Sequence, residues 1–185
     1  MKKTKELISN INFTIEKTDR EEFDNCEFSN CVFGELKRID FTDCVFKNCN
    51  LSNAYFRNCK LQDITFIDCK LIGANFSQVA DFGFCITCES CNLDYTSFDK
   101  KKINKSGFKN CKMHGANFTQ ADLSKASLIN CDFADALFAN TNVSGVDFTT
   151  SKNFLIDPNL NNIKKAKFLS QDLHALLYRY DIIIL

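Results

Sequence analysis

The stretch ANFTQADLSKASLINCDFADALFANTNVSGVDF, residues 116–148, places an apolar residue at every fifth position. The series runs through Phe118, Leu123, Leu128, Phe133, Phe138, Val143 and Phe148. Five residues turn an α-helix by about 500°, which would spread these side chains around the helix. In a strand, successive side chains alternate between two faces, so a period of five would divide the series between them. The pattern therefore predicts a chain that turns the same corner every five residues.

The same period governs most of the sequence. The series extends back to Leu93, an earlier run reaches from Phe41 to Phe76, and a short run at Phe23, Phe28 and Phe33 precedes both. The frame slips by two residues between the two long runs, and we interpret 34–36 as a three-residue insertion. Two positions before each apolar centre the residue is mostly small. Each pentad is expected to turn one large and one small side chain inward and to leave three outside.

The units ANFSQ (74–78), ANFTQ (116–120), ADLSK (121–125) and CDFAD (131–135) carry this pattern in its clearest form. They resemble the repeats of the pentapeptide-repeat family, and the resemblance covers roughly residues 21–150. It implies an all-β solenoid, a right-handed quadrilateral parallel β-helix with four pentapeptides in each coil. Residues 20 apart are then expected to stack at the strand spacing of about 4.8 Å, in columns such as Phe98, Phe118 and Phe138.

Cysteine is unusually frequent, with 11 residues in the chain. Nine of them occupy the small inward position, where we interpret them as core hydrophobes. CITCESC (85–91) suggests a metal site instead, but a structural zinc ion takes four converging ligands. The repeat frame turns Cys88 and Cys91 inward and Cys85 outward, so the three thiols are not expected to converge. Cys111 stacks on Cys91 at a Cα separation near that of a disulfide, which a reducing compartment would disfavour.

Three regions are expected from these patterns. Residues 1–20 form an N-terminal cap, 21–150 form the β-helix with register breaks near 34–40 and 77–92, and 151–185 hold a helix and an apolar tail. Ser170 is a suitable N-cap for that helix, and its apolar residues recur at helical spacing. A homodimer is expected to form through Leu169, Leu173, Leu176, Leu177, Tyr180, Ile182, Ile183 and Ile184.

A narrower resemblance rests on KFLSQDLHALLYRYDIII (167–184) and NFSQVADFGFCITC (75–88). Both segments look like parts of the Qnr and MfpA-like pentapeptide-repeat proteins. That resemblance implies a rod-shaped dimer that binds DNA gyrase and topoisomerase IV, protects them from quinolones and resembles duplex DNA in shape and charge. The two loops of Qnr proteins are reduced here to 34–36 and to DKKKINK (99–105). Lys101 falls on an inward position there and is expected to force a local bulge.

The charge balance gives weaker guidance, because 23 basic residues match 23 acidic ones. A DNA mimic is expected to be acidic, since duplex DNA carries one negative charge per about 1.7 Å. Local acidity exists at Asp122, Asp132, Asp135 and Asp147, which are the candidate partner surface. The overall balance indicates neither direct binding of nucleic acid nor attachment to a membrane.

The sequence contains no pattern typical of an enzyme. It has two histidines and no Gly-rich phosphate loop or GxSxG motif. No apolar run has the length of a membrane span or a signal peptide, so a cytoplasmic location is expected. We therefore expect a non-enzymatic interaction protein without a cofactor that binds a type II topoisomerase. The alternatives are a generic scaffold with another protein partner, and a metal- or redox-responsive protein that uses Cys85, Cys88 and Cys91.

Overall fold

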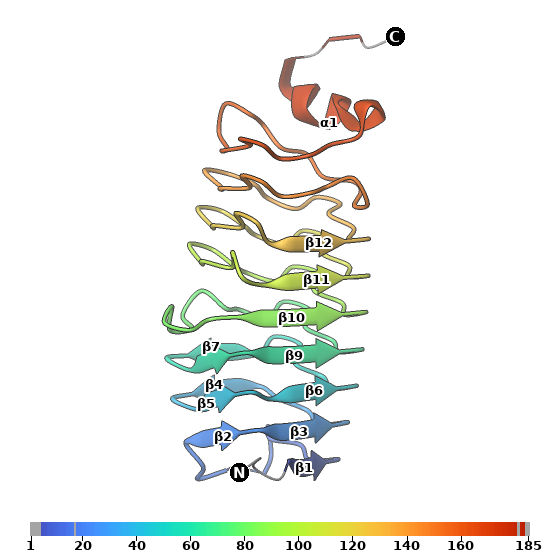
Figure 1. Cartoon of the computed structure of the whole chain (residues 1–185). Helices are drawn as coiled ribbons and strands as arrows, with labels where there is room; N and C mark the ends of the chain where they lie inside the picture. The colour runs from blue at the N-terminus through green and yellow to red at the C-terminus, as the bar shows by residue number, and fades with distance from the viewer. Residues whose placement is uncertain (1–4, 17, 181, 184–185) are drawn as a thin grey trace.

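The computed structural model describes residues 5–16, 18–180 and 182–183. They form a right-handed quadrilateral parallel β-helix that ends in a short helical segment, and successive coils stack along one axis (Figure 1). One face is a seven-stranded parallel sheet, with one strand from each successive coil. Its strands are β1 (Glu6–Ser9), β3 (Cys26–Ser29), β6 (Val45–Lys47), β9 (Ile64–Ile67), β10 (Ile86–Glu89), β11 (Gly107–Lys109) and β12 (Ser127–Ile129). A second face pairs β2 (Glu22–Asp24), β5 (Asp40–Thr42) and β8 (Lys60–Gln62), and a third pairs β4 (Glu35–Lys37) with β7 (Tyr55–Arg57).

The interior consists of the large side chains at the pentad centres. Phe98 and Phe118 stack with ring centroids 5.4 Å apart, and Phe118 and Phe138 with centroids 5.2 Å apart. β11 and β12 pair with a register of 20 residues, Phe108 opposite Leu128. The expected columns of like residues are therefore confirmed, and they bury apolar surface along the whole rod.

The corners explain the polar residues outside the core. The residue two places after many pentad centres has a positive φ, as at Asn48, Asn58, Asp63 and Asn110. Asparagine and aspartate tolerate this left-handed conformation better than most residues. Just before several centres, a side-chain oxygen accepts a bond from the backbone two residues on, as Asn92 does from the Asp94 amide (2.9 Å). These bonds hold the turn in shape.

The parallel ladder extends beyond both boundaries expected for the repeats. Glu6 in β1 lies opposite Cys26 in β3, so the first coil begins within the segment expected as a cap. At the other end Asp147 bridges Lys167, so a further coil is formed after residue 150. The expected limits of 21 and 150 are therefore too narrow for the stacked region.

The first register break is a shortened coil. Phe23 pairs with Phe41 and Phe28 with Phe46, a register of 18 residues, and Leu36 is a buried centre opposite Phe56. The inferred three-residue insertion at 34–36 is therefore wrong. Leu36 restores an inward apolar residue after three positions instead of five, so this coil has two residues fewer.

The second register break is a lengthened coil. Ile64 pairs with Ile86 and Phe66 with Cys88, a register of 22 residues. The two additional residues lie in the segment 79–85, where Phe84 forms an antiparallel bridge with Gln62. The register break expected near 77–92 therefore lies in the coil that leads into β10.

The C-terminal helix differs from the expected one. It consists of a 3-10 turn η1 (Ser170–Asp172), α1 (His174–Leu177) and a 3-10 turn η2 (Tyr178–Tyr180). Ser170 is the first helical residue and Leu169 precedes it without a side-chain capping bond, so the expected Ser170 N-cap is wrong. No helix in the described ranges is long and apolar enough to cross a membrane.

Candidate interaction surfaces

The three clustered cysteines occupy different environments. Cys88 and Cys91 are buried and Cys85 is half-buried, as the repeat frame predicts. The Cys85 thiol donates to the Lys105 carbonyl (3.4 Å), whereas the Cys91 thiol donates to the Phe66 carbonyl (3.5 Å). Within the part of the chain that the structure describes, no three His, Cys, Asp or Glu side chains are grouped so that they could hold a metal ion.

The remaining cysteines form ladders inside the solenoid. The thiols of Cys111 and Cys131 donate to carbonyl oxygens 23 residues earlier, at 3.4 and 3.5 Å. Burial raises the pKa of the Cys44 thiol to about 12 and also raises that of Cys59. All eleven cysteines are free. Ten of them are buried, which agrees with a role as small core residues.

The four candidate acidic residues do not form one patch. Through their backbones, Asp122 forms parallel β-bridges with Lys102 and Asn142, Asp132 with Lys112 and Lys152, and Asp147 with Lys167. These are three different ladders, and Asp135 occupies a corner with a positive φ. The structure therefore distributes the four carboxylates over different sides of the rod.

Three of these carboxylates also support the backbone. Asp122, Asp132 and Asp147 each accept a hydrogen bond from the amide two residues on, at 2.9, 3.3 and 3.0 Å. The Thr149 hydroxyl and amide, with Lys167, lower the pKa of Asp147 to about 2. The presence of aspartate at these three positions is therefore explained in part by the turns that its side chain stabilises.

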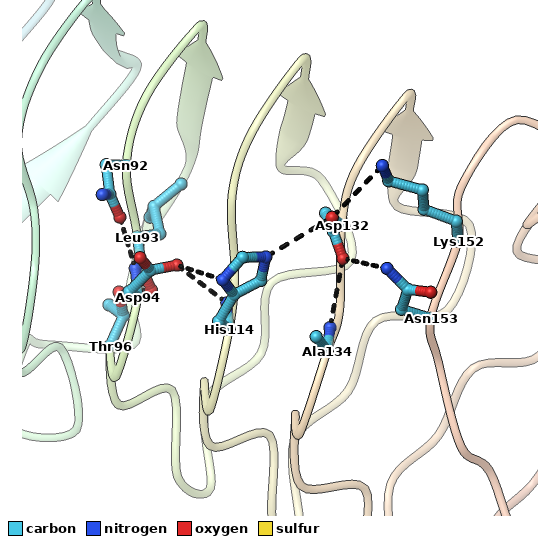
Figure 2. A network of polar contacts seen from close by, with 9 residues as sticks. All are labelled: Asn92, Leu93, Asp94, Thr96, His114, Asp132, Ala134, Lys152 and Asn153. Carbon is cyan, nitrogen blue, oxygen red and sulfur yellow. Dashed lines mark hydrogen bonds and ion pairs between the residues drawn. The ribbon is translucent and has the colours of Figure 1, made fainter.

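Asp132 belongs to a network that crosses several coils (Figure 2). The His114 ring lies between two carboxylates, with Nδ1 3.6 Å from Asp94 and Nε2 3.4 Å from Asp132. Asn153 donates to Asp132 (2.7 Å), and Lys152 lies 3.4 Å from it. Although partial burial acts in the opposite direction, the hydrogen bond from Asn153 and the adjacent His114 ring hold the pKa of Asp132 below its usual value. The network joins neighbouring coils and leaves little free carboxylate for a partner.

The C-terminal segment presents an apolar surface to solvent. Leu169 is 39% exposed, Leu173 45% and Tyr180 52%, while Leu176 packs partly against the core. Leu177 is half-buried, Ile182 and Ile183 are exposed, and Ile184 lies outside the described residues. The helical turns are too short to bury the expected stripe against the last coil, where Ala175 makes the buried contact instead.

Polar contacts attach this segment to the solenoid, among them a bond from the Asn159 side-chain amide to the Tyr180 hydroxyl. Arg179 donates to the buried carboxylate of Asp157 (3.0 Å), and the Ile156 amide donates to the Ala175 carbonyl (3.1 Å). The Asn159 amide and Arg179 lower the pKa of Asp157. The helical turns are therefore held in place while their leucines remain available for contact.

Lys101 has a role that the repeat pattern did not reveal. Its ammonium group donates to the Val79 carbonyl (2.6 Å) and to Asp81 (2.5 Å), and its side chain is only 3% exposed. It also lies over the Phe84 ring, 5.5 Å from the centroid. The buried lysine thus binds two residues of the lengthened coil and holds that segment against the next coil.

The expected bulge at Lys101 is wrong. The Lys101 amide makes the usual turn bond to the Phe98 carbonyl (3.0 Å), and Lys102 bridges Asp122 with the regular spacing of 20. The irregularity lies one coil earlier, where the additional residues expose a carbonyl for the lysine to bind. The sequence feature that could have indicated this contact is the 22-residue separation of Val79 and Lys101, which equals the register of the lengthened coil.

Comparisons with known proteins agree with this architecture. A model of the pentapeptide repeat region matches residues 21–98, and a model of eight pentapeptide repeats matches 116–152. Full-length QnrB1, described as a plasmid-mediated fluoroquinolone resistance protein, is 20% identical with a TM-score of 0.63, covering 97% of this chain and 100% of that one. HetL, described as involved in heterocyst differentiation regulation in the cyanobacterium Nostoc sp. strain PCC 7120, is 11% identical with a TM-score of 0.60 and coverages of 88% and 83%. No curated protein matches the sequence. The two repeat models and the β-helix they describe show that the chain belongs to the pentapeptide-repeat family.

Proposed function

We propose that this protein is a non-enzymatic interaction protein that binds a type II topoisomerase, DNA gyrase or topoisomerase IV, and thereby reduces the damage that quinolones cause. It takes no cofactor in this role. The observation that supports the proposal most is the likeness to full-length QnrB1 along the whole rod, 97% of this chain against 100% of that one. A solenoid acts through its outer surface, so similar length and curvature present similar surfaces to a partner.

The proposed binding form is a homodimer in which two solenoids join end to end. The exposed leucines Leu169 and Leu173 flank η1, and the helical segment that contains α1 lies at the end of the rod opposite the first coil (Figure 1). Contiguous apolar residues on an outer surface commonly mark a protein contact, and a two-fold contact of this segment with itself would cover them. The resulting particle has twice the length of one solenoid.

The proposal depends more on the shape of the rod than on the charge of its surface. Three of the four candidate carboxylates lie on different ladders and Asp135 lies at a corner, and lysines neutralise two of the four. We therefore propose that the topoisomerase recognises the rod and its local contacts, without a continuous negative surface. The eleven free thiols fit a reducing compartment, and we propose the cytoplasm as the site of action.

The second candidate is a scaffold for another protein. The likeness to HetL, whose described role is in regulating differentiation, favours it, because the same solenoid serves a different process there. Fold alone does not define the partner of a repeat protein. The two candidates differ in whether a topoisomerase responds to the protein.

The test is a supercoiling reaction with purified gyrase and a fluoroquinolone. The proposal expects that an excess of this protein over gyrase lowers the amount of quinolone-stabilised cleaved DNA. The matched control is a Leu169→Glu/Leu173→Glu variant, which should remain folded and protect less because it does not dimerise. If cleavage and supercoiling are unchanged at large excess, the topoisomerase proposal fails and the scaffold remains.

A further inference from the structure

The zero net charge conceals a separation of charge along the rod. Residues 1–99 contain 16 acidic and 11 basic residues, whereas residues 100–185 contain 7 acidic and 12 basic residues. Because the solenoid stacks the chain coil by coil, the sequence order becomes the order along the axis (Figure 1). The first half of the molecule is therefore acidic and the second half is basic.

One corner of the solenoid shows this separation most clearly. Asp43, Asp63, Cys85, Lys105 and Lys125 follow one another on successive coils. The Asp43 amide bonds the Gln62 carbonyl, next to Asp63, and the Ile64 amide bonds the Cys85 carbonyl. The Cys85 thiol reaches the Lys105 carbonyl, and the ladder continues with a register of 20. We call these five residues the charged corner.

The four charged side chains of this corner are available to a partner. Asp43, Asp63, Lys105 and Lys125 are all exposed. Among the residues that the structure describes, none of the four forms an ion pair. Cys85, which separates the acids from the bases, is half-buried and its thiol has a raised pKa through burial and the nearby Asp63 carboxylate.

An apolar side chain projects from the coil that contains Cys85. Phe82 is 85% exposed and lies in the lengthened segment that Lys101 holds in place. Gly83 follows with a φ of 74°, which turns the chain back toward the core. A phenylalanine with this exposure costs free energy in water unless a partner covers it.

A two-fold axis through the Cys85 coil, perpendicular to the rod, relates these features to one another. It places the coil after Cys85 opposite the coil before Cys85 in a second copy. Lys105 then faces Asp63 of the second copy and Lys125 faces its Asp43, and symmetry makes each pair occur twice. Phe82 lies on the same coil as the axis, so it approaches its own counterpart.

We propose that the charged corner, with Phe82, is a self-association surface on which two molecules lie side by side and antiparallel. A second copy fits better than an unrelated protein, because the acidic and basic halves are complementary to each other about one central coil. This contact is separate from the C-terminal surface and does not depend on binding to a topoisomerase. Exposed ion pairs are individually weak and screened by salt, so the association should be strongest at low ionic strength.

The test is the mass in solution, measured by sedimentation velocity on a Leu169→Glu/Leu173→Glu background so that only the charged corner can associate. Salt is varied from about 0.02 M to about 0.5 M, which shortens the Debye length from roughly 20 Å to roughly 4 Å. The proposal expects a dimer at low salt that dissociates at high salt. Phe82→Ser should raise the dissociation constant at least tenfold.

Charge reversal identifies the surface. Lys105→Glu/Lys125→Glu should abolish the association, and so should Asp43→Lys/Asp63→Lys, whereas an equimolar mixture of the two variants should form a heterodimer. Lys112→Glu/Lys152→Glu makes the same change of charge on another face and should associate like the background protein. The proposal is overturned if the background protein stays monomeric at low salt, if neither reversal weakens the dimer, or if the mixture does not associate.

Discussion

The ammonium nitrogen of Lys101 lies 2.6 Å from the carbonyl oxygen of Val79, inside a solenoid whose buried side chains are mostly small or apolar. The two residues are 22 positions apart, which is the register of the lengthened coil. The lysine satisfies a backbone acceptor that the two additional residues leave without a ladder partner. A buried charge with hydrogen-bonded partners is tolerated, whereas an unsatisfied carbonyl is costly.

Lys101→Met should therefore destabilise the protein. The aliphatic stem is retained, but the Val79 carbonyl loses its donor, and the expected cost is about 1–3 kcal/mol in the free energy of unfolding. Urea denaturation measures this difference. Lys102→Met is the matched control, since Lys102 is exposed and its replacement should change stability by less than about 0.5 kcal/mol. Equal stability of the two variants would contradict the assigned role of Lys101.

The thiols should be protected from chemical modification in the folded state. Ten of the eleven cysteines are buried and only Cys85 is partly accessible, and burial raises the pKa of that thiol as well. With a thiol-reactive reagent at neutral pH, the native protein should react slowly and at Cys85 alone, and the unfolded protein should react at all eleven positions. Mass spectrometry of the labelled peptides locates the modified residues. Rapid labelling of Cys91 or Cys111 in the native protein would be incompatible with their burial.

The C-terminal leucines should control dimer formation. Leu169→Glu/Leu173→Glu places charges in the apolar surface and is expected to give a monomer, with the circular dichroism of the solenoid unchanged. Ile129→Glu is the matched control, because Ile129 in β12 is similarly exposed, 42%, but lies on the side of the solenoid. Light scattering coupled to size exclusion, at high salt, distinguishes monomer from dimer. A variant that keeps the mass of the parent protein would exclude this surface as the dimer contact.

Acid should weaken the coil that contains Asp147. Its pKa is about 2 in the folded protein, below the value of about 3.9 for an unperturbed aspartate. A lowered pKa means that the contribution to stability is present above about pH 4 and is lost as the pH falls toward 2. Thr149→Val removes the hydroxyl that contributes most to the shift, so the urea midpoint of this variant should decline less between pH 5 and pH 2.5. A titration of the Asp147 carboxyl by NMR gives the pKa directly, and a value near 4 in the parent protein would refute this prediction.

The repeating core could be predicted from the sequence because its cause is local. Each pentad needs one large and one small inward residue, so the positions of Phe98, Phe118 and nine of the cysteines follow from counting. The broken coils could not be derived in the same way. Leu36 is an inward residue only because its coil is short, and the role of Lys101 depends on a carbonyl 22 residues earlier in the chain.

The candidate surfaces were harder to predict for a related reason. Outward positions are constrained little by packing, and some of their acidic residues serve the backbone, as Asp122 and Asp132 do. The distribution of carboxylates over the faces depends on the accumulated register, which includes both breaks. The helical stripe from Leu169 to Tyr180 assumed one continuous helix, whereas the α-helical part is a single turn.

The most direct test of the proposed function is a measurement of binding between this protein and gyrase in competition with duplex DNA. Gyrase is immobilised, the purified protein is added in its dimeric form, and a linear DNA fragment is titrated into the complex at fixed salt. The proposal predicts saturable binding of the protein, displacement by DNA, and at least tenfold weaker binding of the Leu169→Glu/Leu173→Glu variant. If the folded dimer shows no saturable binding to gyrase or to topoisomerase IV, the proposed function is contradicted.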